Sequence, residues 1–87
     1  MRNFNDPKYK EWRELIRKRD GGRCQWPGCL STKKLQVHHI LPWSQYPGLR
    51  FDINNGITLC KNHHNLIKND EISYSHYFFK HISINKK

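Results

Sequence analysis

The sequence contains few acidic residues and no long hydrophobic run. It has seven Asp and Glu residues against 16 Lys and Arg residues, and its formal net charge is +9 over 87 residues. So large a positive charge on a small chain favours a polyanionic partner such as nucleic acid. No segment approaches the roughly 18 apolar residues that span a bilayer, and no N-terminal signal pattern is present. We therefore expect DNA rather than a membrane as the partner, and a cytoplasmic, intracellular location.

Hydrophobic residues and cysteines are also scarce. Only 36% of the residues are hydrophobic, so an apolar core alone would be thin in a domain of this size. The three cysteines are an odd number, which argues against a disulfide framework because one thiol would be left over. Three thiolates and one histidine can instead bind a zinc ion. Three unrelated thiols are the simpler alternative.

Two short Cys/His pairs have the spacing of zinc ligands. Cys24 and Cys29 flank turn residues in the segment CQWPGC, and Cys60 and His63 are separated by two residues in CKNH. Each spacing is typical of a zinc knuckle, and together the pairs provide four tetrahedral ligands. The sequence therefore predicts a structural zinc that joins these two parts of the chain. In the alternative, His63 is an exposed polar residue and the thiols are simply buried.

Predicted helices and strands surround these pairs. Residues 6–20 are expected to form a helix, because Asp6 can cap it, Pro7 fits its first turn and Gly21-Gly22 end it. Apolar and polar residues alternate in residues 34–40, which predicts a short strand, and residues 56–60 read as a second one. Residues 41–54 read as a long loop, and residues 72–83 read as a C-terminal helix. The apolar face of the first helix, which should pack on the rest of the domain, comprises Tyr9, Trp12, Leu15 and Ile16.

Two pairs of adjacent histidines suggest a second metal site. Neighbouring residues point in different directions, so His63 can bind zinc while His64 faces elsewhere. His38, near the end of the first strand, can meet His64, and two imidazoles can hold a divalent ion with positions open for water and phosphate. His39 would then be the general base, since neutral imidazole accepts a proton near physiological pH. For each histidine, an ordinary surface or core residue is the simpler alternative.

Asn55 and several basic residues are further candidates. Asn55 can position the site by hydrogen bonds across the two strands, although asparagine in the segment NNG is also an ordinary turn residue. For any single basic residue, solvation is the alternative to a phosphate contact. The candidates for DNA binding are Arg17, Lys18 and Arg19 in the first helix, Arg50 in the long loop, and Lys68.

The segments VHHI, NNGITLC and CKNHHNLIK together resemble the HNH endonuclease family, above all its small phage-encoded members with zinc knuckles. The resemblance implies an α+β fold in a single domain, residues 1–87, with a zinc-stapled ββα-metal core at residues 22–71 between the two terminal helices. It also implies that His38 and His64 bind the catalytic metal, that His39 is the general base and that Asn55 is the family's central asparagine. His38 replaces the aspartate that the family commonly has, and Lys68 stands where some relatives have a third histidine ligand.

The activity implied by the resemblance is metal-dependent hydrolysis of DNA phosphodiester bonds, by nicking or double-strand cleavage, leaving 5′-phosphate and 3′-hydroxyl ends. The expected ions are a structural Zn²⁺ and a catalytic Mg²⁺, Mn²⁺, Ni²⁺ or Zn²⁺. Phage packaging proteins are candidate partners, and a monomer or a weak homodimer is expected. One alternative is a non-catalytic zinc-stapled DNA-binding module, which has no need of the second histidine site. Another is a component that is active only in a larger assembly.

Overall fold

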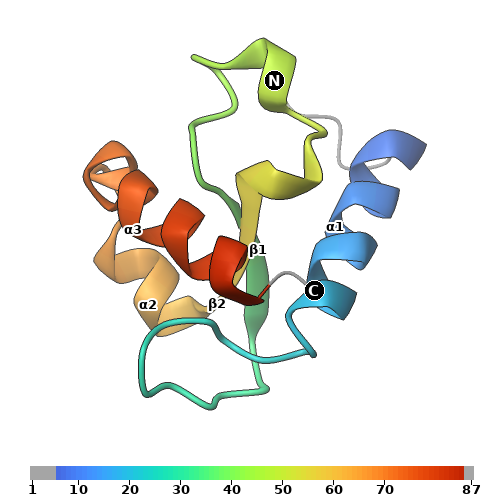
Figure 1. Ribbon diagram of the computed structural model, residues 1–87. Coiled ribbons are helices and arrows are strands. Elements are labelled where there is room, and N and C mark those ends of the chain that lie inside the picture. Colours follow the sequence, from blue (N-terminus) through green and yellow to red (C-terminus); the bar gives the residue numbers. More distant parts are fainter. Residues whose placement is uncertain (1–5, 86–87) are drawn as a thin grey trace.

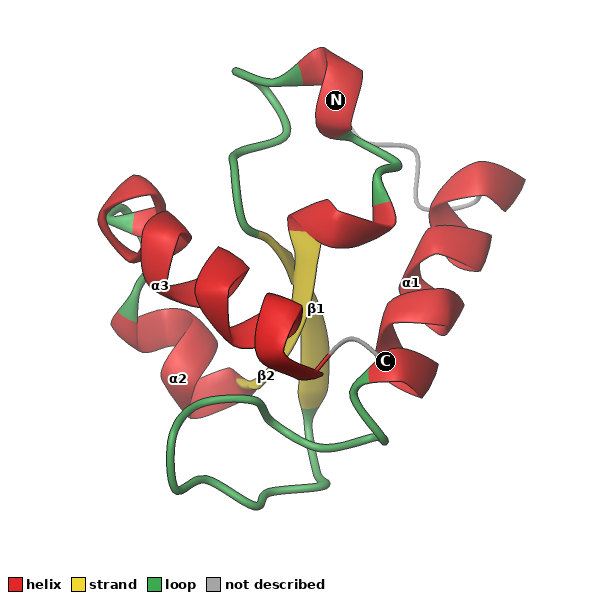
Figure 2. Cartoon of the chain, in the orientation of Figure 1, coloured by secondary structure: helices red, strands yellow, loops and turns green. Residues whose placement is uncertain are grey.

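A two-stranded antiparallel sheet lies at the centre of the computed structural model, which describes residues 6–85 (Figures 1 and 2). Strand β1 is Leu35–His39 and strand β2 is Gly56–Cys60. Helix α1, Pro7–Arg19, covers one face of the sheet, whereas helices α2, Lys61–Leu66, and α3, Glu71–Asn85, lie on the other. The predicted α+β class, with two strands followed by a helix, is confirmed.

Helix α1 begins and ends close to the predicted residues. The Asp6 carboxylate accepts a hydrogen bond from the backbone N–H of Lys8 at 2.8 Å, as expected of an N-cap. Gly21 and Gly22 both have φ of +68°, a left-handed conformation that glycine adopts at little cost, and the helix ends before them. The predicted burial of Leu15 is wrong, because its side chain is 46% exposed. At about 100° per residue, Leu15 falls at the edge of the apolar stripe.

The core consists of two apolar clusters, one on each face of the sheet. On the α1 face, Tyr9, Trp12 and Ile16 pack against Val37. A Cβ atom at Gly56 would overlap side-chain atoms of Trp12 and Ile16, so the glycine lets α1 pack directly on β2. The cluster on the opposite face joins the sheet to α3 and the cysteines, and its buried members are Cys24, Ile40, Ile57, Leu59, Cys60, Ile67, Phe78 and Ile82.

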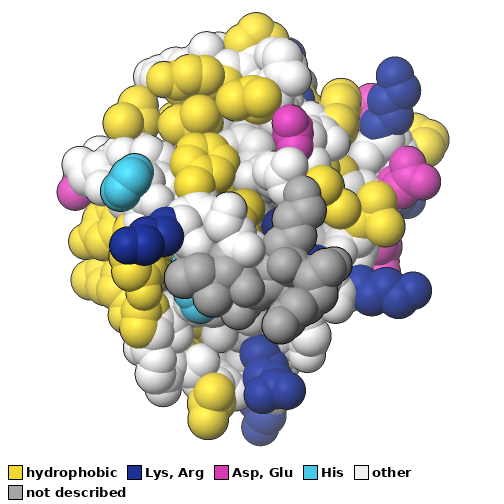
Figure 3. All heavy atoms as spheres, in the orientation of Figure 1, with side chains coloured by type: hydrophobic (Ala, Val, Ile, Leu, Met, Phe, Trp, Pro, Cys, Tyr) yellow, Lys and Arg dark blue, Asp and Glu magenta, His cyan; other side chains and the backbone are white. Residues whose placement is uncertain are grey.

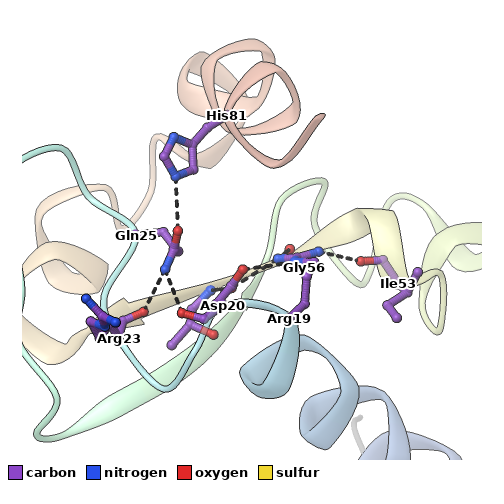
Figure 4. A network of polar contacts seen from close by, with 8 residues as sticks. Arg19, Asp20, Arg23, Gln25, Ile53, Gly56 and His81 are labelled. Carbon is purple, nitrogen blue, oxygen red and sulfur yellow. Dashed lines mark hydrogen bonds and ion pairs between the residues drawn. The ribbon is translucent and has the colours of Figure 1, made fainter. Parts of the chain in front are cut away.

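A polar network holds the end of α1 against the outer edge of β2 (Figure 4). The buried Asp20 carboxylate accepts a hydrogen bond from the backbone N–H of Thr58 at 2.9 Å and two more from the Arg19 guanidinium, at 2.9 and 3.0 Å. The same guanidinium donates to the carbonyl groups of Ile53 and Gly56, at 2.9 and 2.7 Å. The network therefore satisfies backbone groups that a sheet edge would otherwise leave open.

Gln25 extends this network toward α3. Its backbone N–H donates to the carbonyl group of Thr58 at 2.9 Å, and its side-chain amide donates to the carbonyl groups of Asp20 and Arg23. The Gln25 Oε1 atom contacts His81 Nε2 at 3.1 Å (Figure 4). The segment that follows α1, residues 20–25, is thus bonded both to β2 and to α3.

The remaining segments differ from the prediction in detail. The loop between the strands contains two short 3-10 turns, η1 at Pro47–Leu49 and η2 at Ile53–Asn55, where no regular element was predicted. Helix α3 begins one residue before the predicted 72–83 segment and extends to Asn85. In the described part of the chain, no helix has both the length and the apolar character needed to cross a membrane.

Candidate active site and metal centre

Cys24, Cys29, Cys60 and His63 come together in one cluster. One ligand atom from each lies within 4.8 Å of all the others. The Cys60 Sγ to His63 Nδ1 distance is 3.2 Å, Cys24 Sγ to His63 Nδ1 is 3.6 Å, and Cys29 Sγ to Cys60 Sγ is 4.0 Å. Ligand atoms about 2.0 to 2.3 Å from a tetrahedral zinc ion lie about 3.3 to 3.8 Å from one another. The donor set and its spacing are therefore compatible with a zinc site.

Local structure explains why these four residues converge. Between the first two cysteines, Gly28 has φ of +79° and the N–H of Cys29 donates to the carbonyl group of Trp26 at 2.9 Å, so the chain turns back on itself. Cys60 is the last residue of β2, and His63 lies in the first turn of α2. The Trp26 indole stacks on the His63 ring, with 4.7 Å between ring centroids and 6° between planes. The cluster is thus enclosed on one side by an aromatic ring.

The thiols of the cluster differ in acidity. Burial raises the pKa of Cys24 to about 11. Burial also acts to raise the pKa of Cys60, but the backbone N–H of His63 and the neighbouring cysteines outweigh it and lower the pKa below its usual 9.0. Zinc binds thiolates, so zinc binding has to displace the proton of Cys24.

A second site lies at the end of β1, where a cavity of about 480 Å³ opens. Alternation along the strand directs His39 to the α1 face and His38 to the opposite face, where His38 meets His64 of α2. The His38 and His64 ring centroids are 5.4 Å apart with planes inclined at 67°, and Phe78 of α3 packs against His38 at 6.0 Å. The residues that line the cavity include His38, His39, Trp43, His64, Lys68 and Glu71.

The ring of His39 is held on several sides. Its Nε2 atom lies 2.9 Å from the carbonyl oxygen of Arg50, and because a carbonyl group only accepts, Nε2 carries the hydrogen. In the neutral ring, Nδ1 therefore carries the lone pair. The Trp12 indole stacks on the ring at 4.0 Å with 11° between planes, and Trp43 makes an edge contact at 5.3 Å. With 4% of its surface exposed, His39 has a defined tautomer and orientation.

Asn55 fixes the loop that follows β1. Its Oδ1 atom accepts a hydrogen bond from the N–H of Leu41 at 2.8 Å, and its Nδ2 atom donates to the carbonyl groups of Leu41 and Leu49, at 3.2 and 3.1 Å. The backbone carbonyl of Asn55 also accepts from the N–H of Ile40. These bonds join the ends of the two strands and lead into the segment that presents the Arg50 carbonyl to His39. Asn55 thus bonds the loop after β1 to the start of β2.

The five candidate DNA-binding residues have different surroundings. Lys68 is exposed and lines the cavity beside the histidines. The Arg50 guanidinium lies over the Trp43 ring at 4.6 Å, and its Nε atom donates to the Trp43 carbonyl. Arg17 and Lys18 lie on α1, where acidic side chains are interspersed with basic ones in the view of Figure 3. The guanidinium of Arg19, a predicted DNA contact, donates hydrogen bonds to the carbonyl groups of Ile53 and Gly56 within the protein.

Sequence reasoning missed the aromatic surroundings of the histidines. Trp12 was predicted only as part of an apolar face, because its spacing carries no sign that a histidine 27 positions later lies against it. Trp26 offered a better signal, since it lies between the two cysteines of the first pair. Asp20 and Gln25 lacked any signal of their own.

The comparison with known families agrees with this geometry. Residues 22–70, more than half of the chain, match the family described as HNH endonuclease. No curated protein and no solved structure matches the chain. The matched segment includes both histidine pairs, the three cysteines and Asn55. The chain therefore belongs to the HNH endonuclease family.

Proposed function

We propose that the protein is a metal-dependent endonuclease that hydrolyses DNA phosphodiester bonds with His39 as the general base. The observation that carries the proposal is the convergence of His38, His64 and His39 on one cavity of about 480 Å³. A DNA-binding module without catalytic activity requires no such grouping. The net charge of +9 supports an anionic polymer as the substrate.

The two metal sites have different tasks in this proposal. Cys24, Cys29, Cys60 and His63 form a closed set of four ligands, as expected of a structural zinc. His38 and His64 offer two imidazole nitrogens on the wall of an open cavity, which suits a divalent ion that must also accept water and phosphate oxygen. When bound there, the ion supplies positive charge that stabilises the transition state of phosphodiester hydrolysis.

His39 performs the proton transfer. With Nε2–H bonded to the Arg50 carbonyl, the Nδ1 lone pair accepts a proton from a water molecule as its oxygen attacks phosphorus. The bond from phosphorus to the 3′ oxygen breaks in line, and the departing oxygen keeps the electron pair and takes a proton from solvent water, which leaves 5′-phosphate and 3′-hydroxyl ends. The Arg50 carbonyl then faces an imidazolium ion, which its dipole stabilises. Lys68, at the rim of the cavity, is suited to hold a neighbouring phosphate.

The test is cleavage of supercoiled plasmid by the wild type, His39→Ala and His76→Ala. His76 is an exposed histidine of α3 outside the cavity lining, so it controls for the loss of an imidazole. The purified proteins are stripped of loosely bound metal and supplied with Mg²⁺, Mn²⁺, Ni²⁺ or Zn²⁺ in turn. We expect metal-dependent nicking by the wild type and by His76→Ala. His39→Ala should lose at least about 100-fold in rate, because a general base contributes about 10² to 10⁴.

Binding and zinc content make the result interpretable. His39→Ala should bind DNA and retain zinc as the wild type does. If folded, zinc-loaded wild type binds DNA but cuts with none of the ions, the proposal is contradicted and the binding module is favoured. Equal cleavage rates for His39→Ala and the wild type would contradict the role of His39 as the general base.

A further inference from the structure

The indole of Trp12 lies flat against the ring of the proposed base. The two ring centroids are 4.0 Å apart and the planes are inclined by only 11°. Trp12 belongs to α1, which precedes the family match at residues 22–70. The contact therefore brings a segment from outside the matched region onto the site.

The position of Trp12 is itself well defined. Its side chain is 2% exposed, and its Nε1–H donates to the carbonyl group of Asp52 at 2.8 Å. On the sheet, His39 pairs with Gly56, and a Cβ at that position would overlap the Trp12 ring. The missing side chain of Gly56 leaves the space that the indole needs to reach His39. Three separate features, a hydrogen bond, burial and a glycine, thus fix the indole beneath the imidazole.

We propose that Trp12 is a positioning residue for His39, an inference that rests on the proposed function. The Arg50 carbonyl holds one edge of the imidazole through Nε2, and this bond by itself does not stop the ring from rotating about it. The Trp12 face blocks that rotation, and Trp43 meets the ring edge-on at 78°. Together these contacts direct Nδ1 toward the water that attacks phosphorus.

The proposal predicts a loss in turnover rather than in DNA binding. A misplacement of about 1 Å in a reacting group can cost about 100-fold in rate, so we expect Trp12→Leu to lower kcat by roughly 10- to 100-fold. KM for DNA should stay within about twofold, because Trp12 is buried and has no surface to offer to DNA. Trp12→Phe keeps an aromatic face on His39 while losing the bond to Asp52. It should therefore retain activity within about threefold of the wild type.

Ile16→Val is the matched control for a loss of packing. Ile16 lies in the same buried cluster and on the same helix as Trp12, but it has no aromatic ring to stack on His39. All variants are assayed well below their unfolding temperatures, and Ile16→Val should leave kcat unchanged. If Trp12→Phe falls as far as Trp12→Leu, or if Ile16→Val falls with them, stacking is not the cause and the proposal is overturned.

A double-mutant cycle tests whether Trp12 acts through His39. In the His39→Ala background, adding Trp12→Leu should change the residual cleavage rate by less than about twofold, because the ring that Trp12 positions is gone. A further loss of tenfold or more would show that Trp12 acts independently of His39 and would overturn the proposal.

Nuclear magnetic resonance of the His39 ring separates this proposal from the proposed function, since it requires no cleavage. In the wild type and in Trp12→Phe, the ring protons should be shifted upfield by the stacked aromatic face, with a single tautomer protonated at Nε2. In Trp12→Leu the upfield shift should disappear and the tautomers should mix. A single tautomer and a fixed ring in Trp12→Leu would overturn the proposal even if the wild type cuts DNA. Loss of the upfield shift and a mixture of tautomers in Trp12→Leu would support the positioning role of Trp12 even if the wild type does not cut DNA.

Discussion

The two adjacent histidines of α2 illustrate how neighbouring residues acquire different surroundings. His63 turns its Nδ1 atom toward Cys60 and stacks on Trp26, whereas His64 meets His38 across the cavity. About 100° of rotation per helical residue is enough to separate the two directions. A shift of one residue in the α2 sequence would therefore exchange the partners and disrupt both sites.

Asn55 provides a prediction at this scale. Asn55→Ala should lower the free energy of unfolding by about 1 to 3 kcal/mol, because it removes three hydrogen bonds between the Asn55 side chain and part-buried backbone groups of Leu41 and Leu49. Asn65→Ala, the same change at an exposed position of α2, should cost less than about 0.5 kcal/mol. Urea unfolding of the zinc-loaded proteins measures both values. Equal stabilities for the two variants would show that Asn55 does not hold the loop.

Among the elements, α1 and the segment after it protect the outer edge of β2. The backbone N–H of Thr58 donates to the Asp20 carboxylate, and the Thr58 carbonyl group accepts from the backbone N–H of Gln25. Side chains and a short stretch of backbone thus replace a third strand. An edge covered in this way cannot pair with the edge of another chain.

Asp20 provides the prediction for this element. Asp20→Ala should lower the free energy of unfolding by about 3 kcal/mol, since the Arg19 guanidinium and the Thr58 N–H both lose a charged partner. Asp6→Ala removes only the exposed N-cap of the same helix and should cost about 1 kcal/mol. Unfolding in guanidinium chloride at a constant zinc concentration compares the stabilities of Asp20→Ala and Asp6→Ala. A cost for Asp20→Ala no larger than for Asp6→Ala would contradict the structural importance of the network.

Across the whole molecule, the proposed zinc joins the segment after α1 to the end of β2 and the start of α2. Because His64 follows His63 directly, the zinc cluster and the candidate catalytic cavity share the helix α2. Phe78 of α3 contacts both Trp26 and His38 and lies between the two sites. Loss of zinc should therefore disturb the cavity as well as the fold.

Zinc content and its pH dependence test this view. We expect about one zinc ion per chain, released as the pH falls, because zinc holds thiolates and acid returns their protons. The pKa of Cys24 is about 11 before zinc binds, so zinc must lower it greatly, and the stability that zinc adds is present at neutral pH and lost toward acid pH. A colorimetric zinc indicator and circular dichroism, followed together, should report release and unfolding in the same pH range. Folded protein that contains no zinc would contradict the site.

Local signals were enough to predict most elements and the cysteine cluster. Asp6 and Gly21 mark the ends of α1 through their own backbone and capping preferences, and the Cys/His spacings follow from the geometry of zinc. The environment of Arg19 could not be predicted, because its place on a basic helix face favours solvent or DNA and its actual partners lie up to 37 residues away. The stacking of Trp12 on His39 was missed for the same reason, since apolar spacing predicts burial but not the neighbour.

The position of Trp12 also bears on how the borders of this family's functional unit are drawn. A fragment trimmed to residues 22–70 would keep every proposed metal ligand, the proposed base and Asn55. It would lack the indole under His39, the Asp20 carboxylate on Thr58 and the Phe78 ring against His38. The segment that defines membership of the family is thus smaller than the segment that assembles the candidate site, and truncation to residues 22–70 would remove parts of that site that carry no recognisable motif.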